Sequence, residues 1–149
     1  MKSLLGLVLL VSMFAIATPA PPGGMQLPPQ PKTHPGGIPR GALLLSPCII
    51  GMGEHWGNPN YLPVGPFYGV YKGHPVFTEI MIDRKAFAVG KSFENMLKPL
   101  TGYRIDHVDV EFEPHGHEGY PIPHYDVHAY YVSHAVHMAY CPNGIPIPK

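Results

Sequence analysis

Hydrophobic and polar residues alternate along residues 105–113, a pattern typical of a β-strand. Val108, Val110 and Phe112 share one side of that strand, because successive side chains of a strand point to opposite faces. We expect this apolar side to pack against the rest of the domain and the opposite side to be solvated or functional. The opposite side carries His107, Asp109, Glu111 and Glu113.

A second alternating strand is predicted at residues 124–132, paired with the first. One of its faces carries Tyr125, Val127, Ala129 and Tyr131, and the other carries His124, Asp126, His128 and Tyr130. Two imidazoles and a carboxylate therefore lie in a row on one face. The backbone spacing between each of these residues and the one two positions further along is about 6.6 to 7 Å. Side chains of this length can converge on one ion.

The rest of the pattern is also mainly β. Residues 67–71 and 75–82 are rich in aromatic and β-branched residues and are separated by Lys72-Gly73, which predicts a β-hairpin. Asp83 can cap a short helix that continues through Ala88, and a second short helix is expected from Ser92 until Pro99 stops it. The chain is predicted to be mainly β, a single antiparallel β-barrel-like or sandwich domain with one or two short helices.

Composition divides the chain into four parts. Residues 1–17 have a positive start, an apolar run and a small-x-small ending, which predict a secretory signal peptide too short for a membrane anchor. Residues 18–47 are dominated by proline and glycine and are expected to be a flexible, disordered segment. The folded domain is predicted at 48–141, followed by a short tail at 142–149. The protein is therefore expected to be secreted and extracellular.

Charge and cysteine content narrow the function. Lys and Arg total ten, equal to Asp and Glu, and they form no basic stripe, which argues against nucleic acid as a partner. In an oxidising compartment Cys48 and Cys141 are expected to form a disulfide that closes a loop of about 90 residues, worth roughly 4 kcal/mol in the chain-entropy model. The alternative, two thiols joining a metal site, lacks the C-x-x-C spacing.

Six of the ten histidines lie between Pro114 and His137. The predicted metal ligands are His124 and His128 from the strand and His117 from the preceding loop, with Asp126 as a ligand or as a partner that orients an imidazole. Imidazoles with at most one carboxylate suit a transition metal, zinc, copper or iron, better than calcium or magnesium. His134 and His137 are expected on a solvated helical face. Further residues that could support the site are His115, Glu118, Tyr130 and His55.

The stretch GHEGYPIPHYDVHAYY, residues 116–131, resembles an uncharacterised family of small secreted or periplasmic domains. The family motif is G-H, a proline-bearing loop and then P-H-[FY]-D-x-H-x-Y. The resemblance spans about Gly51 to Tyr140 and includes the hairpin GPFYGVYKGHPVFTEIMI and the strand DHVDVEFEP. It implies a compact β-rich domain and no particular activity. The matching positions are Gly116, His117, Pro123, His124, Tyr125, Asp126, His128 and Tyr130.

Three functions fit these patterns. The first is a secreted domain that binds a transition metal through the histidine cluster. The second is a metal-dependent extracellular enzyme, an oxidoreductase or a hydrolase, if one coordination position stays open. The third is a structural matrix or coat protein that self-associates through His-metal cross-links. A Ser-His-Asp hydrolase is not indicated, because no G-x-S-x-G turn holds a serine.

Overall fold

The computed structural model describes residues 26–146, so the predicted signal peptide at 1–17 and the last three residues of the tail lie outside the described part. Six strands form one antiparallel sheet in the order β1-β2-β3-β4-β6-β5. The mainly β prediction is confirmed, but β1 and β5 are the two edges of the sheet, so it does not close into a barrel. The elements are β1 (Leu43–Ile49), β2 (Gly53–Gly57), β3 (Phe67–Tyr71), β4 (His74–Asp83), β5 (His107–Glu113), β6 (His124–Tyr130), the helices α1 (Arg84–Ala88) and α2 (His134–His137), and the 3-10 turn Pro59–Tyr61.

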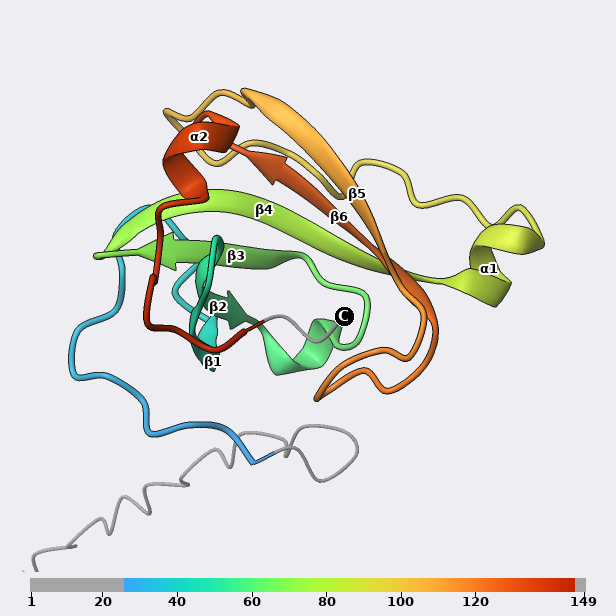
Figure 1. The fold of residues 1–149 in the computed structure, drawn as a ribbon, viewed down its shortest axis with the longest axis horizontal. Coiled ribbons are helices and arrows are strands. Elements are labelled where there is room, and N and C mark those ends of the chain that lie inside the picture. Colours follow the sequence, from blue (N-terminus) through green and yellow to red (C-terminus); the bar gives the residue numbers. More distant parts are fainter. Residues whose placement is uncertain (1–25, 147–149) are drawn as a thin grey trace, which may run out of the picture.

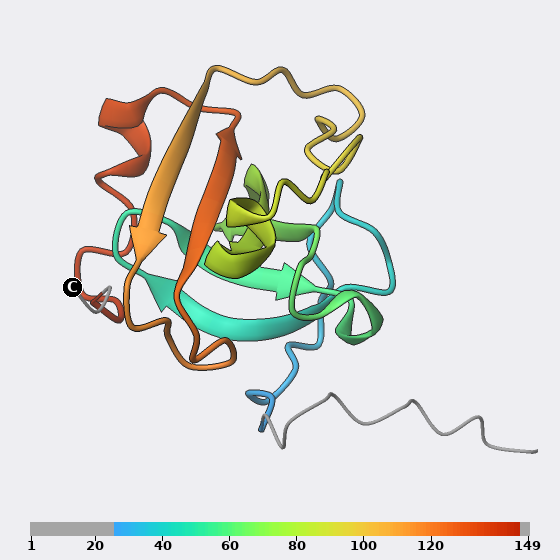
Figure 2. The same cartoon turned by 90° about the vertical axis from the view of Figure 1, so that its right-hand side faces the viewer.

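The sheet is strongly curved, and β5 and β6 cross the direction of β1 and β2 at a steep angle (Figures 1 and 2). One of its two central strands is β4, which pairs with β3 on one side and β6 on the other. Nearly all of β4 is buried. The curvature gives the sheet a concave face, toward which one side of β4, β5 and β6 is turned.

The predicted hairpin and the first predicted helix are confirmed. Lys72 and Gly73 both have positive φ, 50° and 81°, as a two-residue type I′ turn requires. The carboxylate of Asp83 accepts a hydrogen bond of 2.7 Å from the backbone N–H of Lys85, which caps α1. The helix expected from Ser92 is wrong, because that segment has no helical residue and Asn95 lies at φ 64°, a left-handed conformation that interrupts a helix.

The orientation of β5 is the opposite of the one expected. Val108 is 51% exposed, Val110 63% and Phe112 43%, so the apolar side faces outward. The polar side of β5 faces the concave side of the sheet, because Asp109 pairs with His128 and Glu111 with Asp126 on β6, whose polar face is buried. The domain therefore gathers its histidines and carboxylates inside the curve of the sheet.

The two ends of the domain are tied together. The predicted disulfide between Cys48 and Cys141 is present, with a sequence separation of 93, which indicates an oxidising environment. Ile38 and Ala42 are buried against Trp56, so part of the segment expected to be flexible contributes to the core. In the tail, Ile145 forms a backbone bridge with Ile49. Within residues 26–146, no helix is long and apolar enough to cross a membrane.

Candidate metal centre

Among residues 26–146, three groups of side chains are positioned to hold a metal ion, and in each group the ligand atoms lie within 4.8 Å of one another. Residues of two groups line one cavity of about 370 Å³, and the third group is formed by the start of β5 and by α2. The groups are His117, His124 and Asp126; His55, Glu79 and His128; and His107, Asp109, His134 and His137. We call them the His117 group, the Glu79 group and the His107 group.

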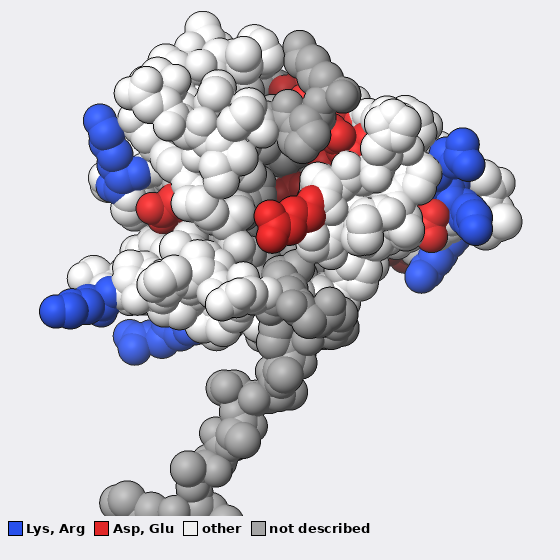
Figure 3. Space-filling model, turned by 60° about the horizontal axis from the view of Figure 1, so that its bottom comes forward, with Lys and Arg blue, Asp and Glu red and all other residues white. Residues whose placement is uncertain are grey.

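The cavity is lined by both apolar and acidic side chains. Its apolar residues include Met52, Phe67 and Met81, and its acidic residues include Glu79 and Asp126. Among the described residues that line it, none is Lys or Arg. On the face drawn in Figure 3, acidic side chains gather near the centre and basic side chains lie at the margins. No Lys or Arg side chain of the described lining therefore balances the carboxylates.

The rings of the His117 group are held by backbone carbonyls. His117 Nδ1 lies 2.9 Å from the carbonyl oxygen of Glu118, and His124 Nδ1 lies 2.6 Å from that of Ile122. Because a carbonyl can only accept, each Nδ1 carries the proton, and each Nε2 of the neutral ring presents a lone pair. The two Nε2 atoms face each other at 3.2 Å.

This geometry fits a metal ion. Zinc bonds to imidazole nitrogen at 2.0–2.1 Å, so two nitrogens of a tetrahedral site lie about 3.3 Å apart. Asp126 adds its two oxygens, Oδ1 at 3.0 Å from His124 Nε2 and Oδ2 at 3.8 Å from His117 Nε2. Oδ1 is buried without a hydrogen-bond partner, which a bound cation would provide. His117 and Asp126 line the cavity, so an ion held by these residues would be accessible from it.

The Glu79 group has weaker contacts. The two oxygens of the Glu79 carboxylate lie 3.6 Å from His55 Nε2 and 3.6 Å from His128 Nε2, beyond hydrogen-bonding distance. Burial raises the pKa of Glu79 to about 7, and burial followed by the nearby His128 lowers the pKa of His55 to about 3. Burial also acts to lower the pKa of His128, but Glu79 and the other carboxylates outweigh it and raise that pKa.

The structure brings together three of the four predicted ligands and separates the fourth. His128 belongs to the Glu79 group, together with His55, which was expected only to support the site. Glu118 supplies the carbonyl that orients His117 and also lines the cavity. His115 is exposed and lies outside the three groups. Tyr130 is buried and stacks on the rings of His128 and His137, so it separates the Glu79 and His107 groups.

The predictions from the sequence did not include two features of these groups. Glu79 is not among the residues predicted from the sequence, although a single carboxylate in the apolar run VFTEIMI is a signal of a buried functional group. The expectation that His134 and His137 lie on a solvated face is wrong for His137, which is 3% exposed. The His137 ring is buried between two neighbours. Its Nδ1 donates a hydrogen bond of 2.8 Å to the carbonyl of Gly51, and the ring stacks on Tyr130.

Comparison with known proteins shows a likeness in fold to a solved structure. No family model matches the chain, and no curated protein matches it. The crystal structure of a hypothetical protein from Thermus thermophilus, TTHB210, is similar, with a TM-score of 0.52 and 25% sequence identity over 62% of this chain and 89% of that chain. The similarity supports the β-rich fold, and that protein is described only as hypothetical.

Proposed function

We propose that this chain is a secreted protein that binds a transition-metal ion through His117, His124 and Asp126. The observation that carries the proposal is the pair of imidazole Nε2 atoms 3.2 Å apart, each made a lone-pair donor by a carbonyl that holds the opposite ring nitrogen. A pair of facing lone pairs next to a carboxylate is unfavourable without a cation, and the separation is close to that of two nitrogens on one ion.

The charge of the cavity supports the same proposal. Burial raises the pKa of Asp126 and that of Glu79, so the charged form of each carboxylate is costly in the metal-free protein. A divalent cation would offset that cost, because the described lining holds no Lys or Arg. Two imidazoles and one carboxylate favour zinc, copper or iron over the oxygen-seeking calcium and magnesium.

The test is the metal content of the purified full chain, stripped with a chelator, reloaded and dialysed. His117→Ala should lose one ion per chain relative to the wild type, because it removes a ligand from a partly exposed loop position. His115→Ala is the matched control, since it removes an exposed histidine two residues away. His124→Ala removes a second ligand and is an independent test. Circular dichroism checks that this substitution of a buried residue leaves the fold intact. Wild-type metal content in both His117→Ala and His124→Ala would reject the proposal.

A second candidate function, a metal-dependent enzyme, is favoured by the open side of this site. Three protein ligands around an ion that is accessible from a cavity are the arrangement of catalytic rather than structural zinc. A bound ion would supply Lewis acidity there, and Met52, Phe67 and Met81 would contact an apolar part of a substrate. Metal-dependent turnover of a panel of ester, phosphoester and oxidisable phenolic substrates, lost in His117→Ala, would favour the enzyme, and its absence would favour binding alone.

The third function predicted from the sequence, cross-linking between chains, has less support. His124 is fully buried, and its Nε2 points at His117 and Asp126 of the same chain. These ligands are therefore directed at an ion within one chain and do not reach a neighbouring one.

A further inference from the structure

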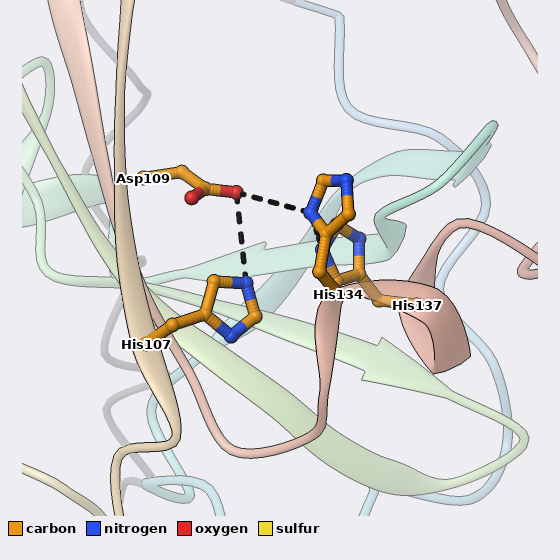
Figure 4. Close-up of side chains that lie close together, drawn as sticks. All are labelled: His107, Asp109, His134 and His137. Atoms are coloured by element: carbon orange, nitrogen blue, oxygen red, sulfur yellow. Dashed lines mark hydrogen bonds and ion pairs between the residues drawn. The ribbon is translucent and has the colours of Figure 1, made fainter.

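The His107 group lies apart from the site proposed above. His107 and Asp109 come from β5, and His134 and His137 come from α2, so the group joins the edge of the sheet to the last helix (Figure 4). Tyr130 stands between it and the Glu79 group, with its ring stacked on His107 at 4.9 Å and on His137 at 3.9 Å. The function proposed above uses none of its four side chains.

Two of the three imidazoles are oriented in the way that metal ligands are. His137 Nδ1 donates to the carbonyl of Gly51 at 2.8 Å, and His107 Nδ1 lies 3.0 Å from the carboxylate of Asp106. Each contact assigns the proton to Nδ1 and leaves a lone pair on Nε2, as in the carboxylate-histidine and carbonyl-histidine pairs around bound metals. His107 Nε2 is buried and has no hydrogen-bond partner.

The four potential ligand atoms converge in the space between β5 and α2. Asp109 Oδ2 lies 3.6 Å from His107 Nε2 and 3.7 Å from His134 Nδ1, as Figure 4 shows. His134 Nδ1 lies 3.1 Å from His137 Nε2. Without an ion, the Nδ1–H of His134 can donate a hydrogen bond to Nε2 of His137. When His134 instead carries its proton on Nε2, its Nδ1 presents a lone pair, and an ion can take the place of the hydrogen-bonded proton.

We propose that His107, Asp109, His134 and His137 form a second transition-metal site. Three imidazole nitrogens and one carboxylate oxygen are a complete tetrahedral set, which is typical of a structural ion and differs from the open three-ligand His117 group. The ion that this site would bind is a divalent first-row transition metal such as Zn²⁺.

The structural consequence is that the ion holds α2 against the sheet. A helix of four residues has no stability of its own, and Ser133 at its N-cap makes no side-chain hydrogen bond to it. The side chains of α2 reach the rest of the domain through the His137 hydrogen bond to Gly51 and the stacking of His137 on Tyr130 and His107. His134 adds a contact with Asp109, which an ion would strengthen. A metal bound to β5 and to α2 would fix both the helix and the segment that leads to Cys141.

The test uses the full chain carrying His117→Ala and His124→Ala, which removes the first site. This background should retain one Zn²⁺ per chain after dialysis, and the further substitution His134→Ala should remove it. The His134 side chain is 65% exposed, so its loss should not disturb folding. His74→Ala, an exposed histidine on β4, is the matched control and should keep the ion. Co²⁺ bound in this background should show the strong visible absorption of a tetrahedral site, lost in His134→Ala.

Either of two results would overturn the second site: a background chain that binds no Zn²⁺, or a His134→Ala chain that binds as much as the His74→Ala control. The proposals for the two sites can be rejected independently of each other. In the wild-type chain, loss of an ion with His134→Ala but with neither His117→Ala nor His124→Ala would support the second site and reject the function proposed above.

Discussion

Replacing Glu79 with glutamine should stabilise the metal-free protein at alkaline pH and change it much less at acidic pH. The Glu79 side chain lies in the middle of β4, is 3% exposed, and has no hydrogen-bonding contact with His55 or His128, each 3.6 Å away. Burial is the main cause that raises its pKa from 4.5 to about 7. Glutamine keeps the shape of the side chain and removes the charge.

The sign and size of the effect follow from that pKa. The folded protein holds the Glu79 proton more tightly than the unfolded chain does, so this stabilisation is complete below pH 4.5 and is lost as the pH rises through about 7. Each pKa unit corresponds to about 1.4 kcal/mol, so a shift of roughly 2.5 units costs about 3 kcal/mol at pH 8.5. Glu79→Gln should therefore be more stable than the wild type by about 3 kcal/mol at pH 8.5 and by only about 1 kcal/mol at pH 5.

The assay is urea unfolding in the presence of a chelator, with the disulfide intact, followed by the fluorescence of Trp56, the only tryptophan of the chain and a buried one. Glu94→Gln is the control, because Glu94 is exposed, and it should change the free energy of unfolding by less than about 0.5 kcal/mol. The reasoning is refuted if Glu79→Gln brings no gain at pH 8.5, or an equal gain at every pH.

Three further predictions concern the disulfide, the metal and the orientation of β5. Cys48→Ser with Cys141→Ser should lower the free energy of unfolding by about 4 to 5 kcal/mol, since the crosslink spans 93 residues, and a loss below about 1 kcal/mol in urea titrations would contradict this. Zn²⁺ at a free concentration 100 times its dissociation constant should stabilise the stripped protein by about 2.7 kcal/mol per site, and His117→Ala should lose one such increment in thermal melts, whereas equal increments in His117→Ala and wild type would count against the His117 site. Val110→Thr should change stability by less than about 0.5 kcal/mol, because Val110 is 63% exposed, and a loss of 2 kcal/mol or more would mean that the apolar side of β5 is packed.

Alternation along the chain predicted which residues share a face but not which face is buried. The pattern of β6 placed His124, Asp126 and His128 on one side, and the structure agrees. The same reasoning on β5 assigned the apolar side to the core, which is wrong. Periodicity defines two faces, whereas the pairing partner and the curvature of the sheet decide their environment. The concave side is already occupied by the polar face of β6, and β5 follows it in register.

The metal groups depend on contacts between residues far apart in the sequence. Glu79 meets His128 only because β4 pairs with β6 with these two residues opposite each other, across 49 positions of sequence. His134 and His137 were predicted to share one side of a short helix, but the docking of that helix against His107 and Gly51 is a tertiary contact. The loop that brings His117 to His124 could be anticipated, because it is short and precedes the strand directly.

We propose that one ion lies between His117, His124 and Asp126. The measurement that tests it most directly is anomalous X-ray diffraction from crystals of the zinc-loaded protein, collected on both sides of the zinc absorption edge. We expect an anomalous peak about 2.0 to 2.2 Å from His117 Nε2, His124 Nε2 and an Asp126 oxygen. A fully loaded crystal with no peak at that position would contradict it.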